Sequence, residues 1–486
     1  MKRFLFSIST ITMTYDIYLG GRKLPFITFR GGFYMSKKEN SVNQITEGVI
    51  WKQLLIFFFP IMLGTLFQQL YNTADAVVVG RFVGTQALAA VGGSTGQITN
   101  LIVNFFVALA SGATVIIARY YGAKNKKDLN DTLHTAAALS IIGGIITTVI
   151  GIALAPVLLE MMKTPRDVLP DSVTYLRIYF AGIIFVFIYN VGSAILRAVG
   201  DSTRPLYFLI ICCFINIFLD ILLVVGFNMG VAGAAAATVI SQIVSAILII
   251  HALIKSSDMY QLQPRQIRFH KFLLVSIITI GLPAGIQSVM YNISNIIIQT
   301  SLNNLGTDTM AAYTAFGKID AIYWMISGAF SVSIITFIGQ NYGAGKYDRM
   351  KKSVKVCLFL DFIASVLVSA LLLFLGRYLL QLFTTDPEVI EIGMEIINII
   401  APSYVLFIFI EILSSALRGM GNVLIPMIMT CTGVCVLRIL WIFLAVPHWP
   451  GVRTILMSYP ISWGLTAVLF IIYYFFDQKK FYKTHQ

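Results

Sequence analysis

The sequence predicts an all-α polytopic membrane protein, with about twelve transmembrane helices in two pseudo-symmetric six-helix bundles. Three observations support this prediction: an apolar composition, apolar runs long enough to cross a bilayer, and an internal repeat. Of the 486 residues, 57% are hydrophobic and only 12% are charged, and the mean hydropathy is +0.82. This composition lies outside the usual range of soluble globular domains.

The apolar runs are long and continuous. A helix needs roughly 20 apolar residues to cross the hydrocarbon core of a bilayer, and such runs recur along the chain. A membrane β-barrel would require alternating polar and apolar residues, which these runs lack. We therefore predict helices near residues 50–80, 86–118, 132–160, 172–197, 204–227, 231–255, 271–301, 309–340, 353–383, 388–417, 424–447 and 453–476.

The second half of the chain repeats the first. LRAVG at 196–200 recurs as LRGMG at 417–421, and YGA at 121–123 recurs at 342–344, in both cases 221 residues later. Six helices per half is an even number, so both halves enter the membrane in the same direction. Paired bundles of this kind enclose a cavity between them and are typical of transporters, although a purely structural duplication would produce the same repeat.

The repeat also divides the chain into domains. We predict an N-terminal lobe at 35–255 with helices 1–6, a cytoplasmic interlobe linker at 256–270, and a C-terminal lobe at 271–486 with helices 7–12 and a cytoplasmic tail. Residues 1–34 are interpreted as an N-terminal extension that reflects a mis-assigned start, because a second start, MSKK, begins at Met35. The alternative is an amphipathic segment on the membrane surface.

The net charge of +13 is explained by membrane topology. After Met35, 22 Lys and Arg residues fall in one set of alternating loops and tails, and 5 fall in the opposite set. Because basic loops remain in the cytoplasm, we predict a multi-pass protein of the plasma membrane with both termini cytoplasmic. We expect the lipid bilayer as its surroundings, no nucleic-acid partner, and a monomer.

Neither an enzyme nor a cofactor-dependent protein is predicted. The five cysteines lie in apolar spans and the five histidines are scattered, without metal-ligand spacing. Glycine-rich stretches such as GRFVG at 80–84 lack the P-loop lysine and the preceding strand. We therefore expect no catalytic residues, no cofactor, no nucleotide, and no metal other than a coupling ion.

Ionisable groups inside membrane spans mark candidate functional sites, because a charge there is energetically costly. Asp75 lies on the first predicted helix with Tyr71 one turn earlier, and Asn216 and Asp220 are four residues apart on the fifth. Thr238 on the sixth offers a hydroxyl. Two carboxylates in a poorly hydrated pocket cannot both stay charged, so they would share a proton or a Na⁺ ion. This predicts a cation-coupling site, with a structural hydrogen bond between helices as the alternative.

The second half carries different polar residues. Asn295 is at the position equivalent to Asp75, and Trp441 is at the position equivalent to Asp220. The second half therefore does not repeat the acidic pair, and we predict that cation coupling is asymmetric between the two halves. Asp361 is not ranked, because it is predicted to lie too near a span end or to be paired too easily. Internal ion pairs are the alternative to substrate contact for the remaining candidates, which are Glu411, Asp320, Lys318 and Gln287.

An ordered set of motifs runs along essentially the whole chain after Met35. The motifs are TEG at 46–48, YNTADAVVVGRFVG at 71–84, the two YGA loops, LRAVGDSTRP at 196–205 and GVAGAA at 230–235. This set resembles the multidrug and toxic compound extrusion (MATE) transporters. The resemblance implies a MATE-like fold and a rocker-switch antiporter that expels small cationic or amphipathic compounds in exchange for H⁺ or Na⁺. It also implies that Tyr71, Asp75, Asn216, Asp220 and Thr238 fall on the cation site of the N-terminal lobe.

Two other functions remain open. A flippase for lipid-linked oligosaccharides or precursors, of the same broad structural group, would line its cavity with several Arg or Lys residues facing anionic phosphates. The sequence offers Lys318, Arg438 and Arg177 for that role. A polytopic membrane enzyme would need clustered His or carboxylate side chains at one membrane face, and we find no such cluster in the sequence.

Overall fold

The computed structural model describes residues 18–19, 22–23 and 45–485. The chain forms two compact units, Met1–Val42 and Asn43–Gln486. We call the second the helical unit and describe each unit by itself.

The first unit contains a pair of short strands, β1 (Tyr18–Leu19) and β2 (Arg22–Lys23). They pair antiparallel, with Tyr18 opposite Lys23 and Leu19 opposite Arg22. Most of the predicted extension at 1–34, and the second start at Met35, lie outside the described residues.

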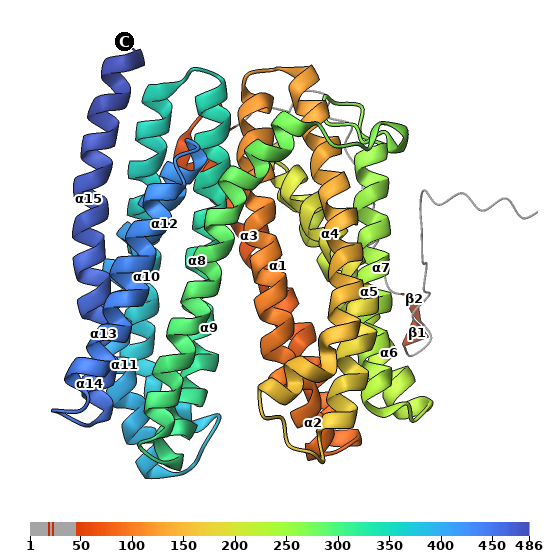
Figure 1. Cartoon of the computed structure of the whole chain (residues 1–486), viewed down its shortest axis with the longest axis vertical. Helices are drawn as coiled ribbons and strands as arrows, with labels where there is room; N and C mark the ends of the chain where they lie inside the picture. The colour runs from red at the N-terminus through yellow and green to blue at the C-terminus, as the bar shows by residue number, and fades with distance from the viewer. Residues whose placement is uncertain (1–17, 20–21, 24–44, 486) are drawn as a thin grey trace, which may run out of the picture. The chain divides into compact units, whose positions relative to one another are not determined.

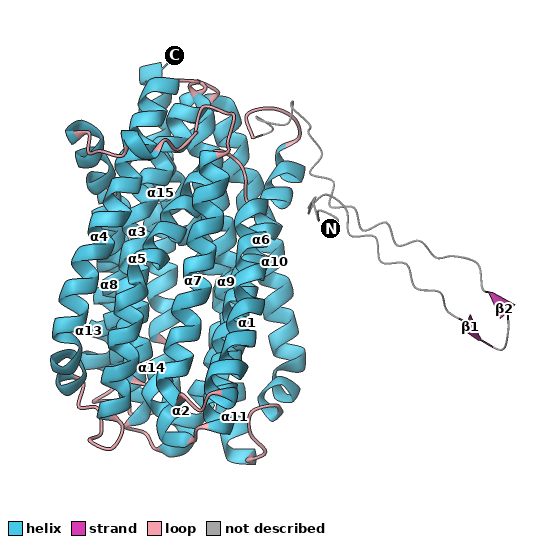
Figure 2. Ribbon diagram, turned by 90° about the vertical axis from the view of Figure 1, so that its right-hand side faces the viewer, coloured by secondary structure: helices cyan, strands magenta, loops and turns pink. Residues whose placement is uncertain are grey.

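The helical unit is built from helices that run along its long axis (Figures 1 and 2). They form twelve candidate membrane spans within residues 45–485, which confirms the predicted fold class. The helices are α1 (Ile50–Phe82), α2 (Thr85–Gly92), α3 (Ser94–Gly122), α4 (Lys126–Met161), α5 (Leu169–Ala198), α6 (Thr203–Asp220), α7 (Gly230–Ile254), α8 (Lys271–Asn303), α9 (Thr307–Gly343), α10 (Tyr347–Gln381), α11 (Pro387–Gly419), α12 (Leu424–Thr430), α13 (Leu437–Ala445), α14 (Val452–Leu456) and α15 (Ser458–His485).

Several spans depart from a single regular helix. The second span, predicted near 86–118, is present at Thr85–Gly122 but breaks at Gly93, where an added Cβ would lie 2.5 Å from the Ala89 carbonyl oxygen. The fifth and eleventh spans pass through π-helical segments, at Ile221–Gly226 and Cys431–Val436. π-Helical turns are rare and often lie at functional sites, and the first of these begins directly after the predicted site residue Asp220.

The helices pack into two bundles. In the first half, α5 packs against α4 and α7, and α1 packs against α6. In the second half, α11 packs against α9, α10 and α15. Figure 1 shows the two groups side by side. The domain limits at 35–255, 256–270 and 271–486 stay predictions.

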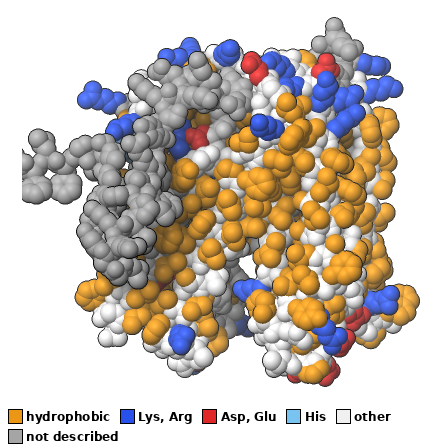
Figure 3. Space-filling view, turned by 180° about the vertical axis from the view of Figure 1, so that it is seen from behind, with side chains coloured by type: hydrophobic (Ala, Val, Ile, Leu, Met, Phe, Trp, Pro, Cys, Tyr) orange, Lys and Arg blue, Asp and Glu red, His pale blue; other side chains and the backbone are white. Residues whose placement is uncertain are grey.

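The two ends of the helical unit differ in charge. One end, which we call the basic end, carries the connections rich in Lys and Arg and the end of α15. Figure 3 shows Lys and Arg side chains along its upper rim, apolar side chains below them, and a hollow between the two bundles toward the opposite end. The connections at the basic end are residues 123–125, 199–202, 255–270, 344–346 and 420–423.

The two bundles touch closely at the basic end. A Cβ added to Gly343 would lie 1.9 Å from the Arg119 carbonyl oxygen, and one added to Gly122 would lie 2.0 Å from that of Gln340. Only glycine permits such a close approach of two backbones. The Arg119 guanidinium also donates to the Met420 carbonyl at 2.8 Å. The repeated YGA motif therefore has a structural reason, because its two copies face each other across the bundle interface.

The segment before α1 is bound to the second bundle. The Arg349 side chain at the start of α10 donates to the carbonyl oxygens of Ile45, Glu47 and Gly48, at 3.0, 2.7 and 2.8 Å. Hydrogen bonds from a charged donor are stronger than neutral ones. The TEG motif at 46–48 thus belongs to the contact between the bundles at the basic end.

Candidate cation and substrate site

A cavity of about 400 Å³ lies beside the first bundle. Side chains of α1, α3, α5, α6 and α7 line it, and Lys318 of α9 reaches it from the second bundle. A cavity of this volume accommodates a drug-sized molecule. Much of the lining is polar, including Gln68, Asn72, Asn100, Asn190, Arg197 and Gln242.

The structure brings two of the predicted carboxyl groups together next to this cavity. Asp75 lines it and is 5% exposed, and Asp220 is fully buried where α6 packs against α1. Each carboxyl group lies within hydrogen-bonding reach of the other, and Asn216 lies within reach of Asp75. The Thr238 hydroxyl donates to Asp75 Oδ2 at 3.2 Å. Four of the five residues predicted for the coupling site therefore meet at one point.

Most of the polar atoms at this point have no partner. Within the described residues, Asp75 Oδ1, both carboxyl oxygens of Asp220 and both amide atoms of Asn216 make no hydrogen bond of normal geometry. No Lys or Arg there forms an ion pair with either aspartate. Buried carboxyl groups left in this condition are costly, because the lost hydration is not replaced.

Tyr71, the fifth predicted residue, lies at the edge of the same cluster. It is 6% exposed, and its hydroxyl accepts a long hydrogen bond of 3.5 Å from Gln242 Nε2. The Tyr71 hydroxyl lies close enough to the Asp75 carboxyl group to interact with it electrostatically. Tyr71 lines the cavity together with Asp75.

The sequence prediction missed three neighbours of the cluster. Tyr175 of α5 lies near both aspartates and near Thr238, and Tyr179 and Gln242 line the cavity beside it. A signal for them was present: Tyr175 and Tyr179 are four residues apart, as are Thr238 and Gln242, and this spacing places each pair on one helix face.

The donor set suits a small cation. Carboxylate, amide and hydroxyl oxygens are the ligands that hard cations prefer, and Asp75, Asp220, Asn216 and Thr238 supply all three kinds. A proton shared between the two carboxyl groups would neutralise them equally well. The arrangement can therefore hold either H⁺ or Na⁺.

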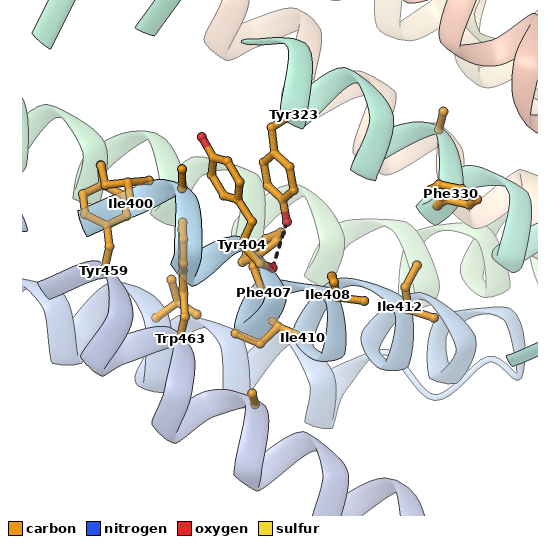
Figure 4. Packing of buried hydrophobic residues seen from close by; sticks show 14 of the residues in the cluster. Tyr323, Phe330, Ile400, Tyr404, Phe407, Ile408, Ile410, Ile412, Tyr459 and Trp463 are labelled. Carbon is orange, nitrogen blue, oxygen red and sulfur yellow. Dashed lines mark hydrogen bonds between the residues drawn. The ribbon is translucent and has the colours of Figure 1, made fainter. Parts of the chain in front are cut away.

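The four residues predicted for substrate contact in the second half have different surroundings. Of the four, Lys318 is exposed and lines the cavity described above. Asp320 accepts hydrogen bonds from Trp324 Nε1 at 2.7 Å and from the Tyr404 hydroxyl. Tyr404 in turn stacks on Tyr323 with 3.7 Å between ring centroids (Figure 4). Asp320 thus belongs to an aromatic network within the second bundle.

The other two lie on facing helices of the second bundle. Gln287 of α8 is 7% exposed and accepts a hydrogen bond of 3.4 Å from Arg418. Glu411 of α11 is half-buried and lies near Arg418 and Asp361 without an ion pair among the described residues. Substrate contact by either side chain stays a prediction.

Asp361 requires a correction. The sequence prediction left it unranked as too near a span end or too easily paired, whereas it lies in the middle of α10, is fully buried, and forms no ion pair within the described residues. The reason is that α10 begins at Tyr347, before the start predicted at 353, so Asp361 lies farther from the beginning of the helix than expected. Asp361 is therefore an ionisable group within a membrane span.

Twelve apolar spans within residues 45–485, in two bundles with a polar cavity and buried ionisable groups, define the protein as a polytopic membrane transporter. A family model described as MatE matches residues 60–222 and 283–444, one match in each half of the repeat. The chain therefore belongs to the MATE family. Members of this family are transporters, so the chain is not an enzyme, and the membrane-enzyme alternative is wrong.

Curated relatives agree with this assignment, and a solved structure shares the fold. "Probable multidrug resistance protein YoeA" of Bacillus subtilis (strain 168) is 29% identical over 440 residues, 89% of this chain and 95% of that protein. "Probable multidrug resistance protein NorM" of Thermotoga maritima is 27% identical over 404 residues, 82% and 86% of the two chains. A structure described as an outward-facing conformation of a multidrug resistance MATE family transporter matches with a TM-score of 0.85 and 22% identity, covering 91% of this chain and 99% of its own.

Proposed function

We propose that this chain is an ion-coupled antiporter that exports small cationic or amphipathic organic compounds in exchange for H⁺ or Na⁺. The observation that carries the proposal is the buried pair Asp75 and Asp220, which lies beside a drug-sized cavity without a fixed counter-ion. The relatives YoeA and NorM are named as multidrug resistance proteins, which supports drug export.

Coupling follows from the charge of the pair. Two negative charges in a poorly hydrated bundle repel each other and lose hydration, so the unloaded pair favours a conformation open to water. A proton or Na⁺ held by Asp75 and Asp220 removes this penalty and permits closure. Asn216 and Thr238 supply further oxygen ligands, and Tyr71 lines the path from the cavity. A cationic substrate and the coupling ion then compete for the same negative charge.

Alternating access is proposed to occur by rocking of the two bundles. The close contacts of Gly122 and Gly343 hold the bundles together at the basic end. Opening that end would separate these backbones and break the bond from Arg119 to Met420. Because Asp75 belongs to the first bundle and Lys318 to the second, the same motion would reshape the cavity between them.

The orientation is part of the same proposal. The excess of Lys and Arg at one end supports a cytoplasmic location for that end, and we propose that both termini lie on the cytoplasmic side of the plasma membrane. We further propose that the protein works as a monomer, with lobes at 35–255 and 271–486.

The test is uptake of a fluorescent lipophilic cation by inverted membrane vesicles with an acidic or a sodium-rich lumen. We expect Asp75→Asn and Asp220→Asn each to lower gradient-driven uptake by about tenfold or more, because an amide cannot exchange charge with a cation. Asp167→Asn, an exposed loop residue, is the matched control and should behave like the parent. Unchanged uptake in both site variants would contradict the proposed coupling site. The gradient that drives uptake by the parent, of protons or of sodium, identifies the coupling ion.

A flippase for lipid-linked oligosaccharides or precursors is the second candidate. One observation favours it: Arg197 and Lys318 line the cavity, and both could face an anionic phosphate. Reconstituted protein that moves a fluorescent lipid-linked sugar across a bilayer, and fails to move lipophilic cations, would establish this function. We favour drug export, because the pair Asp75 and Asp220 opposes the binding of an anion in the same cavity.

A further inference from the structure

An apolar groove lies on the first bundle, apart from the polar cavity described above. Its volume is about 220 Å³, and side chains of α4, α5 and α7 form its walls. Residues 262–267 of the connection between α7 and α8 close it at the basic end. The lining is aliphatic apart from one glycine, one proline and Ser140, whose hydroxyl donates to the Ala137 carbonyl at 2.8 Å. The groove therefore offers apolar contact and no free polar group.

The groove and the polar cavity use opposite faces of α5. Ile188, Val191 and Ile195 recur at intervals of three and four residues, so they lie on one face of the helix, and this face lines the groove. Asn190 and Arg197 lie on the opposite face and line the polar cavity. Since α4 and α7 both pack against α5, the groove runs between them on the outer side of the bundle.

Exposed apolar side chains continue from the groove along α4. Ile141 lines the groove, and Ile145, one turn further from the basic end, is 50% exposed. Val149 follows after another turn and is 63% exposed. Apolar side chains exposed within a membrane span contact lipid acyl chains. An acyl chain that enters the groove near the basic end can therefore extend along α4 toward the middle of the bilayer.

The closing segment is fixed to both walls of the groove. The backbone N–H of Gln263 donates to His134 Nε2 of α4 at 3.0 Å, and Asn130 Nδ2 of α4 donates to Gln266 Oε1 at 3.0 Å. On the other side, the Leu262 N–H donates to the carbonyl oxygen at the end of α7, also at 3.0 Å. The end of the groove is thus held in place by hydrogen bonds to α4 and to α7.

Positive charge lies beside the closed end of the groove. Arg265 and Arg268 directly follow two residues that line it, Pro264 and Ile267, and both arginines are exposed. Within the described residues neither forms an ion pair with a carboxylate, and Arg268 Nε donates to His270 Nε2 at 3.2 Å. Two guanidinium groups therefore remain available for an anion from outside the chain.

The surrounding segments share this excess of positive charge. Residues 124–131 and 255–271 together contain seven Lys or Arg residues and three Asp residues. One of these, Asp131, lies 3.4 Å from His270, and another, Asp258, accepts a hydrogen bond of 3.2 Å from a tyrosine hydroxyl. Basic side chains at the membrane end of helices attract anionic headgroups, and guanidinium groups bind phosphate strongly.

We propose that this groove binds one anionic phospholipid, with an acyl chain between α4 and α7 and the phosphate headgroup at Arg265 and Arg268. A neutral lipid would leave the arginines unused, and a soluble phosphate would leave the apolar groove unused. The site shares no residue with the antiport proposed above and goes beyond it. A bound lipid would also hold the connection between the two bundles against the first bundle.

The experiment measures lipid binding to purified full-length protein in detergent by native mass spectrometry. The probes are phosphatidylglycerol, which is anionic, and phosphatidylcholine, which is neutral overall. One variant combines Arg265→Gln with Arg268→Gln, and a second, Ala137→Leu, fills the groove. Lys352→Gln combined with Lys355→Gln is the matched control, because these exposed lysines are also three residues apart and remove the same charge at the basic end, on α10.

We expect the parent to bind one phosphatidylglycerol about tenfold more tightly than phosphatidylcholine. The double arginine variant should lose this preference, and Ala137→Leu should weaken binding of both lipids by about fivefold or more. The lysine control should behave like the parent. Because Arg265 and Arg268 are exposed, their variant tests the site even where Ala137→Leu lowers the folded yield.

Three results would overturn the proposal. Equal weakening in the lysine control would mean that the lipid responds only to the overall charge of the basic end. Unchanged binding in a folded Ala137→Leu variant would mean that the acyl chain does not use the groove. Displacement of the bound lipid by an equal concentration of glycerol phosphate would assign the arginines to a soluble phosphate. The assay measures lipid binding alone, so its result does not depend on drug transport.

Discussion

The two bundles use equivalent positions in opposite ways. In the first bundle, Asp75 and Asp220 face each other without a fixed cation. In the second, the equivalent position of Asp75 is Asn295, whose amide oxygen accepts a hydrogen bond of 3.4 Å from Arg438. Arg438 is 2% exposed, and its guanidinium lies 4.1 Å from the ring centroid of Tyr459. The carboxyl groups of the first bundle have no fixed cation beside them, so an exchangeable cation can bind there. In the second bundle, the Arg438 guanidinium is a permanent cation at the equivalent position.

This difference shows how a duplicated fold can divide its roles. A guanidinium stays charged under all physiological conditions and stacks well on aromatic rings, so Arg438 is suited to holding helices together. A carboxylate pair changes its charge when a cation binds or leaves. The first position is therefore suited to coupling and the second to architecture, although both lie between the first and fifth helices of their bundles.

Among the substitutions that test this comparison, Arg438→Ala is expected to have the largest effect on the free energy of unfolding. Truncation removes the stacking on Tyr459 and leaves a cavity among buried side chains, which should lower the free energy of unfolding by about 3 kcal/mol. Asp75→Asn should change it by less than about 1 kcal/mol, because the amide keeps the shape and removes a buried charge. Thermal unfolding in detergent measures both.

Arg453→Ala is the control for that prediction, since Arg453 is exposed at the end opposite the basic end. A stable Arg438→Ala variant with normal transport, together with an unfolded Asp75→Asn variant, would reverse the roles that we assign to the two bundles.

An effect of intermediate size on the free energy of unfolding is expected at the contact between the two YGA copies, where the two bundles are equivalent. Gly343→Ala and Gly122→Ala should each lower the free energy of unfolding by about 2 kcal/mol, because the new Cβ meets backbone atoms at 1.9 and 2.0 Å. Gly328→Ala is the matched control on the same helix as Gly343, because its Cβ would meet nothing within 4 Å. That variant should be as stable as the parent or slightly more stable.

Transport assays on the same glycine variants test the rocking motion. Both substitutions should slow turnover, because the bundles cannot close fully at the basic end. A large effect at Gly343 with none at Gly122 would show that the YGA copies are not equivalent, and would weaken the symmetric description of the interface.

The fold could be predicted from the sequence because the bilayer restricts the secondary structure of apolar segments. Long apolar runs must be helices, and a repeat of even helix number sets the relative direction of the two bundles. The acidic pair was also predictable, because carboxyl groups inside apolar runs are rare and Asp75 and Asp220 have few alternatives in their half. That the two would meet depended on α1 packing against α6, which no local pattern specifies.

The remaining residues were missed for physical reasons. Tyr175 contributes to the site, but tyrosine is common at membrane interfaces, so its four-residue spacing from Tyr179 is by itself a weak functional signal. Asp361 was left unranked as too near a span end or too easily paired, because the start of α10 was predicted too late and the sequence does not show which side chains face Asp361. Glu411, Asp320 and Gln287 were grouped by type alone, whereas side-chain packing distributes them among separate hydrogen-bonding partners, as with Tyr404 for Asp320 and Arg418 for Gln287.

The smallest expected effect is the sharpest test of the comparison. Asn295→Asp introduces into the second bundle the side chain that the first has at the equivalent position. Since Arg438 already lies 3.4 Å from the amide oxygen, the new carboxylate should pair with it and raise the free energy of unfolding by about 1 kcal/mol. Asn292→Asp, one turn earlier on α8 and bonded to the Ser288 carbonyl, should gain no such stability. Because a fixed guanidinium neutralises the carboxylate at position 295, ²²Na⁺ binding and proton uptake should stay at the parent's values. If Asn295→Asp binds an additional cation, Arg438 does not neutralise the new carboxylate, and the comparison of the two bundles is wrong.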